Sequence, residues 1–379
     1  MSDNRTKRVH ASILRVSKMK PTAEDTRRAL HARRLETLYA LTPEIKQQER
    51  RALHLLKAPR YPHIIPTLHR VNVKDRPLWK YLRIILSTAP YRGRGGRQGT
   101  FFCIDKKSGG ILGIVECNSD LQTLAPRDRL IGWTRETKYR RGGLGRVIGM
   151  GTCVSAQPFG WLCGGKYISE AVSTDLIASW WTEKYHDVPG MVCTTSLYGR
   201  ASQYNRLPSW DYLGTTQNAV PHGHLTRPEI VDLMQYFYQS RLKARAGGYG
   251  NIKENLRDVF LAVAADLKIK PKTFQGAGDP RGVYVSELYP GALVDMQTNT
   301  TPSQYEYRRH DEVASWWVDR WCNMRWPKVQ DRIALFDWSA YSVNGAMRLS
   351  KNGARRPVEG ATYPVVAGGA EPTSALHSR

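Results

Sequence analysis

The chain has 379 residues, of which 41% are hydrophobic, so it is long enough for two domains with a large buried core. Its 57 lysines and arginines outnumber its 33 aspartates and glutamates, which gives a formal charge of +24. An excess of this size repels itself and favours an anionic partner. Nucleic acid is the first candidate, because phosphates bind Lys and Arg without sequence recognition. We expect DNA, with RNA as an alternative that charge alone does not exclude.

Targeting and redox features point to the cytoplasm. The first 20 residues are basic and have no apolar core, which excludes a secretory signal there. No apolar run is long enough to cross a bilayer, so we expect no membrane partner. No pair of the six cysteines has CxxC spacing, and most lie in apolar, strand-like contexts. We therefore expect buried thiols in a reducing cytoplasm, in place of a zinc site or a disulfide framework.

The pattern of the N-terminal region, residues 1–60, predicts a basic helical arm. Residues 1–20 predict a poorly ordered segment. Leucines at helical spacing follow between residues 22 and 57, and Thr42-Pro43-Glu44 predicts that a second helix begins there. The arginines and lysines of these helices either bind a nucleic-acid backbone or lie on a solvated surface, and both interpretations stay open.

The region 61–220 alternates helix and strand patterns. A helix is expected at 78–87 and a basic glycine-rich loop at 90–99. Residues 100–118 predict a β-hairpin around Lys-Lys-Ser-Gly-Gly, whose glycines can take positive φ. The remaining elements expected here are a strand at 147–157, a Gly-Gly turn and helix at 161–187, and strands at 189–198 and 212–216.

The region 221–342 is expected to be rich in helices. Helical patterns lie at 226–246, 251–267 and 308–326, with one strand at 281–289. Histidines at 222 and 224 have the spacing of solvated loop residues more than of metal ligands, and no metal site is expected. Residues 343–379 are rich in small residues, Pro and Gly and predict a disordered tail.

The order of elements in 78–216 resembles the GNAT acyltransferase fold, in which helices flank a mixed central sheet. In that family a strand ends where its neighbour turns away, and a glycine-bearing loop opens the next helix. The positive end of such a helix binds a pyrophosphate. Gly164, Gly165 and Lys166 stand at the matching place and would hold acetyl-CoA or another acyl-CoA. The usual Arg/Gln-x-x-Gly-x-Gly/Ala pattern is absent, and a purely structural Gly-Gly turn is the alternative.

Two narrower resemblances concern DNA. The segment 109–133 is similar to the DruA family of the Druantia antiphage systems, and the segment 199–216 is similar both to DruA and to Mom, a phage DNA-modification family. The first match rests on Arg127, Asp128, Ile131, Gly132 and Trp133. The second rests on Gly199, Tyr204, Trp210, Leu213, Gly214 and Thr216.

Four residues are candidates for chemistry: Tyr91, Glu116, Asp128 and Tyr204. The Mom resemblance implies the two tyrosines, although Pro90 replaces the family's His and its late Asp falls near Ser196. A carboxylate at either acidic position would serve as a general base. Structural alternatives remain open, since Glu116 would also pair with Arg127, and Arg127 with Asp128.

These observations predict a GNAT-like α/β protein that transfers an acyl-type group to a DNA base, of phage or mobile-element origin. The alternative is a DNA-binding component of a Druantia-like defence or transposition system without enzymatic activity. Candidate DNA-binding residues are Arg92, Arg94, Arg97, Arg140, Arg141, Arg200 and Arg206.

Overall fold

The chain divides into two compact units. The computed structural model describes residues 3–89, 96–134, 136–197, 199–217, 219–242, 256–301 and 304–355. One unit consists of Met1–Ala29 and Thr216–Arg281, and the other of Leu30–Thr215 and Gly282–Arg379. The smaller unit is thus formed by the N-terminus and by a segment inserted between two strands of the larger unit. This division differs from the regions expected from composition, which placed boundaries near residues 60, 220 and 342.

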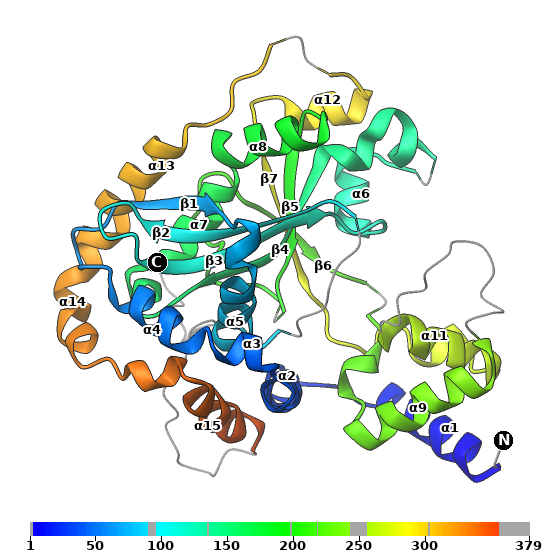
Figure 1. Ribbon diagram of the computed structural model, residues 1–379. Coiled ribbons are helices and arrows are strands. Elements are labelled where there is room, and N and C mark those ends of the chain that lie inside the picture. The colour runs from blue at the N-terminus through cyan, green and yellow to red at the C-terminus, as the bar shows by residue number, and fades with distance from the viewer. Residues whose placement is uncertain are drawn as a thin grey trace, which may run out of the picture. The chain divides into compact units, whose positions relative to one another are not determined.

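A seven-stranded mixed sheet forms the centre of the larger unit (Figure 1). Its order is β1-β2-β3-β4-β5-β7-β6, and all neighbours are antiparallel except β4 and β5. The strands are β1 (Pro66–Arg70), β2 (Gln98–Asp105), β3 (Ile111–Ser119), β4 (Val147–Ser155), β5 (Met191–Thr195), β6 (Asp211–Thr215) and β7 (Gly282–Glu287). The predicted α/β fold with a mixed central sheet flanked by helices is confirmed.

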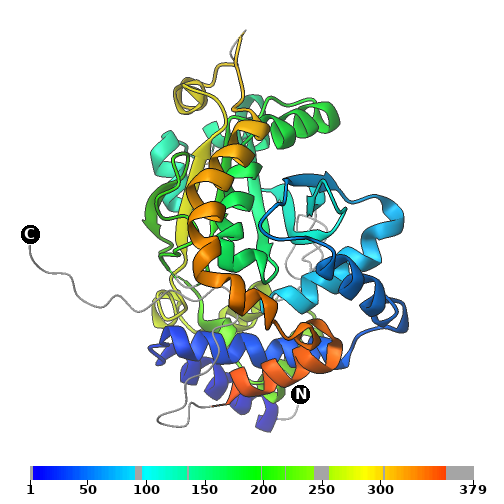
Figure 2. The same ribbon diagram turned by 90° about the vertical axis from the view of Figure 1, so that its left-hand side faces the viewer.

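Helices cover both faces of the sheet. Ile114 of β3 packs in a core with α4 and α5, whereas the next residue, Val115, packs with α7 and α8. We call these the α5 face and the α7 face, and Figure 2 shows α13 and α14 on the side opposite α4 and α5. The described α-helices of the larger unit are the end of α2 (Ala23–Tyr39), α3 (Pro43–Lys46), α4 (Glu49–Lys57), α5 (Arg76–Leu86), α6 (Ala125–Ile131), α7 (Gly164–Val172), α8 (Asp175–Tyr185), α12 (Ala292–Thr298), α13 (His310–Trp317), α14 (Asn323–Ala334) and α15 (Val343–Ala354).

Helix α6 lies on the α5 face. Ile148 and Val192 share the α7-face core with Val115, so the alternating neighbours Val147 and Met191 point the other way. These two residues pack with α6. Side chains of α5 and α6 therefore approach the sheet from the same side.

Strands β4 and β5 stay together for only a short distance. They pair in parallel from Val147↔Met191 to Gly149↔Cys193. Beyond that point β4 continues beside β3 to Ser155, and β5 continues beside β7 to Thr195. The two strands part there, and both faces of the sheet carry polar side chains near the parting.

The β2–β3 hairpin follows its prediction. Gly109 takes φ of +67°, the left-handed conformation that glycine adopts without steric cost. The Asp105 carboxylate accepts hydrogen bonds from the backbone N–H of Ser108 (3.2 Å) and from its hydroxyl (2.7 Å), which closes the turn.

The smaller unit is helical. Its described α-helices are α1 (Asp3–Ser17), the start of α2 (Ala23–Tyr39), α9 (Arg227–Gln239) and α11 (Leu256–Asp266). Val9, Ile13 and Val16 of α1 are buried in a core with residues of α9 and α11. The prediction of a poorly ordered segment at 1–20 is wrong, because these three apolar residues recur at helical spacing and give the basic helix a buried stripe.

Two other expectations differ from the structure. The single helix expected at 161–187 is interrupted before α8, where the Thr174 hydroxyl donates to the Ala171 carbonyl (2.7 Å) and competes with the helical pattern. Within the tail expected to be disordered, residues 343–354 form α15. The Ser342 hydroxyl caps this helix by accepting from the Gly345 N–H.

Candidate functional site

A buried ion network connects α6 to the loop before it. Arg127 is fully buried, and its guanidinium donates to Asp128 Oδ1 from Nε (3.0 Å) and Nη2 (2.6 Å). The Nη1 group donates to the Asp120 carboxylate and to the Leu121 carbonyl (2.9 Å). Burial lowers the pKa of Arg127, but the charges of Asp120 and Asp128 outweigh it and hold the pKa above its ordinary value. The Arg127–Asp128 pairing considered from the sequence is therefore present.

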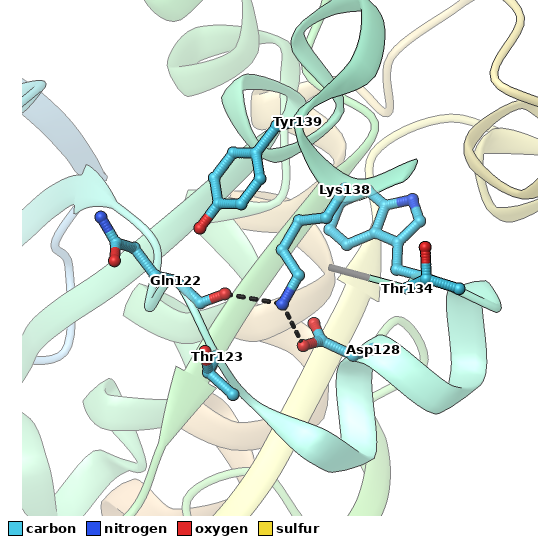
Figure 3. A pocket seen from close by; sticks show the side chains of 7 residues that line it. Gln122, Thr123, Asp128, Thr134, Lys138 and Tyr139 are labelled. Atoms are coloured by element: carbon cyan, nitrogen blue, oxygen red, sulfur yellow. Dashed lines mark hydrogen bonds and ion pairs between the residues drawn. The ribbon is translucent and has the colours of Figure 1, made fainter. Parts of the chain in front are cut away.

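Lys138 completes this network from the other side. It comes from the 3₁₀ segment η2 (Thr137–Arg146), and its Nζ donates to Asp128 Oδ2 (2.5 Å) and to the Gln122 carbonyl (2.7 Å) (Figure 3). The network holds two carboxylates and two cations, so its formal charge is zero. Each charged group has an opposite partner, as buried charges require.

The network forms one side of an open cavity of about 510 Å³. The cavity is lined by Gln122, Thr123, Asp128, Trp133, Thr134, Lys138 and Tyr139. Tyr139 is 53% exposed, and its ring stands across the cavity from Asp128 with the hydroxyl turned inward (Figure 3). The cavity thus combines two aromatic rings with hydroxyl, carboxylate and ammonium groups.

The motif Arg-Asp-x-x-Ile-Gly-Trp builds this cavity for identifiable reasons. Gly132 ends α6 with φ of +74°, a left-handed cap that a side chain would strain. The chain then reverses, and the Trp133 N–H donates to the Asp128 carbonyl (2.8 Å). The Arg127 guanidinium carbon lies 5.6 Å from the centre of the Trp133 ring, and this contact helps to fix the ring.

Glu116 lies on the α5 face in a second polar cluster. It is 4% exposed, and its carboxylate accepts hydrogen bonds from Gln98 Nε2 (2.8 Å) and Thr152 Oγ1 (3.0 Å). Arg83 of α5 donates from Nε to the same threonine oxygen (3.0 Å). Arg127, the partner considered from the sequence, is bonded to the two aspartates instead. The structure therefore places Glu116 on the same face of the sheet as Asp128, in a separate network.

Tyr204 lies on the opposite face. Its ring centre is 4.4 Å from that of Tyr284 and 5.2 Å from that of Trp210, inside the α7-face core. Burial raises the pKa of Tyr204 well above its usual value, and its hydroxyl interacts with Thr194 and Ser169. Tyr204 is therefore a neutral core phenol that packs where β4 and β5 part, and the sheet separates it from Glu116.

The start of α7 is covered by the chain itself. A Cβ on Gly164 would collide with the Phe159 ring, so this glycine allows close packing. Gly165 faces the side chain of Gln203, and Lys166 Nζ donates to the carbonyls of Ser202 (2.8 Å) and Asn205. Residues 202–205 therefore contact the start of α7, where the resemblance would place an acyl-CoA pyrophosphate.

Three of the candidate DNA-binding arginines, Arg97, Arg200 and Arg206, have side chains that the structure describes. Arg97 pairs with Asp187 and lies 5.0 Å from the centre of the Tyr185 ring. Arg200 is exposed beside Tyr212, and Arg206 is exposed in the segment that covers α7. Arg140 and Arg141 belong to η2, and their side chains lie outside the described part of the structure. Tyr91, Arg92 and Arg94 lie outside the described residues.

Sequence reasoning missed Lys138 and Tyr139. They stand in the basic stretch "TRETKYRRGG", where one buried lysine cannot be told from its exposed neighbours by pattern. The available signal was their position shortly after the Arg-Asp-x-x-Ile-Gly-Trp motif, which carries a buried aspartate in need of a cation.

Metal and membrane features are not found in the described ranges. His224 pairs with Asp279 (3.0 Å), and His310 with the Tyr167 hydroxyl (2.8 Å). No group of three or more His, Cys, Asp or Glu among the described residues is arranged to hold a metal ion. The helices in that part of the chain lack the length and apolar character needed to cross a membrane.

Comparison with known proteins gives a family. The family model "Druantia protein DruA" matches residues 24–289. The Druantia protein DruA of Escherichia coli (strain UMEA 4076-1) is 25% identical over 253 residues, which cover 62% of this chain and 62% of that protein. The match therefore spans less than two thirds of that relative. No solved structure matches. Because the family match covers well over half of the sequence and includes the motif that builds the cavity, the chain belongs to the DruA family.

Proposed function

We propose that this protein binds DNA as a component of a Druantia-type antiphage defence system. The family suggests the defence role, and the charge of +24 suggests the partner. The ion network beside α6 supports the inference that the surplus positive charge serves DNA binding. Its carboxylates are neutralised internally, so the surplus cations lie elsewhere and are available to phosphates.

Binding of the full chain to labelled DNA tests this proposal. Fluorescence anisotropy at about 50 mM salt would compare a DNA duplex, the same sequence as a single strand, and the matching RNA. Binding of either DNA form more tightly than RNA supports the proposal. RNA bound more tightly than both would move the partner to RNA, and the absence of binding to all three would contradict nucleic-acid binding altogether.

Two arginines permit a sharper test. Arg200→Gln and Arg206→Gln remove exposed cations, and each loss of a phosphate contact lowers the slope of log affinity against log salt by about one. Arg309→Gln is the matched control, because Arg309 is exposed but already paired with Asp311 (2.8 Å). Equal slopes for all three variants and the wild type would remove Arg200 and Arg206 from the interface.

A second candidate function is transfer of an acyl-type group to a DNA base. It is favoured by the short parallel pairing of β4 and β5, which part as the GNAT resemblance expects, and by the buried carboxylate of Glu116 on the α5 face near that place. A carboxylate there would accept the proton that an exocyclic amine of a base gives up. The acyl-type group would have to come from a separate donor molecule, whose remainder would leave as the new bond to the base forms.

Nucleoside mass spectrometry tests the second candidate. DNA from cells that express the wild type would contain a modified nucleoside that is absent with Glu116→Gln. Tyr204→Phe serves as the comparison, because it keeps the core ring. Identical nucleosides in cells with and without the protein would contradict the transfer reaction and leave DNA binding alone.

A further inference from the structure

The cavity beside Asp128 and Lys138 has the chemistry of a nucleobase site. We infer that it takes a single base turned out of a DNA strand. The inference rests on the proposed DNA binding and names the part of the DNA that is recognised. The volume of about 510 Å³ lies within the range of about 300–1,000 Å³ usual for small-molecule sites.

The aromatic rings supply a stacking surface. Tyr139 is 53% exposed and lines the cavity, and the half-buried Trp133 lines it as well. The Arg127 guanidinium engages Trp133 from within the protein and holds the ring in place. A base has a π-face whatever its sequence, so such rings bind any extruded base.

The polar groups of the cavity suit the edge of a base. Lys138 Nζ donates to Asp128 and to the Gln122 carbonyl and has a third N–H to offer, the Gln122 amide can donate and accept, and so can the hydroxyls of Thr123 and Thr134. Recognition of a flipped base needs such a mixture, because the Watson–Crick edge of each base carries donors and acceptors.

The charge balance favours a base over a phosphate. Asp128 offsets the ammonium of Lys138, and Asp120 offsets Arg127, so the network has no net positive charge. A phosphate would require unpaired cations, whereas an uncharged base requires hydrogen bonds and stacking. The surplus cations elsewhere on the chain would hold the DNA backbone while the cavity holds the base.

A base that leaves the helix changes its stacking partners, and this change can be measured at equilibrium. A duplex with 2-aminopurine opposite an abasic site reports this change, because the emission of 2-aminopurine rises when it leaves the helix and falls when it stacks on a protein ring. The full chain would be titrated with this duplex and with a fully paired duplex of the same sequence. Tyr139→Ala would be compared with Tyr139→Phe, and Tyr39→Ala is the matched control, because Tyr39 is 60% exposed and outside the cavity.

We expect the wild type, Tyr139→Phe and Tyr39→Ala to produce the same emission change on the abasic duplex. Tyr139→Ala should lose most of it and bind that duplex about 5- to 150-fold more weakly, the equivalent of one stacked base. Its affinity for the fully paired duplex should change less. Free 2-aminopurine deoxyriboside should bind only weakly, since it lacks the backbone.

Three results would overturn the inference, and they point to different causes. Binding of neither duplex by the wild type would remove the proposed function as well. Normal DNA binding with the same emission for Tyr139→Ala and Tyr39→Ala would leave DNA binding intact and reject the base site. A free deoxyriboside that binds as tightly as the abasic duplex would assign the cavity to a soluble small molecule.

Discussion

Lys138 Nζ lies 2.5 Å from Asp128 Oδ2, while the other oxygen of the same carboxylate receives two hydrogen bonds from Arg127. One aspartate thus joins a fully buried cation of α6 to a cation from η2. This relationship fixes the wall of the cavity, because neither segment is held there by strand pairing. The Arg-Asp motif therefore holds α6 and η2 together and also forms one wall of the candidate site.

Removal of Lys138 should destabilise the larger unit. In Lys138→Met, Asp128 keeps Arg127 but loses a charged hydrogen bond, so the free energy of unfolding should fall by about 1.5–3 kcal/mol. Urea unfolding of the full chain measures this loss. Lys351→Met in α15 is the control, since Lys351 is exposed. Equal stability of the two variants would show that the Asp128–Lys138 contact contributes nothing.

Arg127→Ala should cost more than Lys138→Met. It leaves Asp120 and Asp128 buried without their shared partner, which costs about 3–5 kcal/mol for a buried pair broken on one side. Urea unfolding again gives the difference. A loss below that of Lys138→Met would contradict the central place of Arg127 in the network.

The attachment of α1 to the smaller unit should depend on its apolar stripe more than on its charges. Ile13→Ala removes a fully buried side chain and should cost about 2–5 kcal/mol, whereas Arg8→Ala breaks an exposed pair with Asp232 and should cost much less. Hydrogen exchange of α9 would report both losses. The reverse order would show that ion pairs hold α1.

Acid should weaken the packing around His310. Burial lowers the pKa of His310, and the nearby charges of Lys106, Asp175 and Asp311 modify it. The Tyr167 hydroxyl donates to the Pro66 carbonyl (2.7 Å) and so accepts from a neutral imidazole at His310. The unfolded chain therefore binds this proton at higher pH than the folded protein does.

The stability from His310 is therefore complete above the unfolded pKa of about 6.5 and decreases as the pH falls towards the folded pKa. Unfolding free energies between pH 7 and 5 should fall less steeply in His310→Gln than in the wild type. His63→Gln, at an exposed position, should keep the wild-type slope. Identical slopes in all three proteins would contradict a buried neutral His310.

Much of the fold could be predicted from the sequence, because local patterns determine it. The hairpin around Gly109 and most helices were visible as turn chemistry and periodicity. The ordered helix α1 was missed because its buried residues, such as Ile13, are outnumbered by charges and meet partners more than 200 residues away. The insertion of residues 216–281 between β6 and β7 has no local signal at all.

The site was only partly predictable for the same reason. Asp128 was found from its motif, but the contact with Lys138 depends on how η2 returns over α6. Glu116 and Tyr204 were both candidates for chemistry, and the structure places them on opposite faces of the sheet. Alternation along β3 directs Glu116 to the α5 face, whereas Tyr204 lies in the segment between β5 and β6. That segment packs on the α7 face through contacts with distant residues such as Tyr284, which no local pattern marks.

The salt dependence of DNA binding tests the central claim most directly. For the full chain and a duplex of about 20 base pairs, log affinity should fall linearly with log salt, with a slope of about −0.9 for each phosphate contacted. A slope steeper than about −4 is the result expected for a protein that uses its surplus charge on DNA. An affinity that does not change with salt, or no binding at about 50 mM salt, would contradict the account.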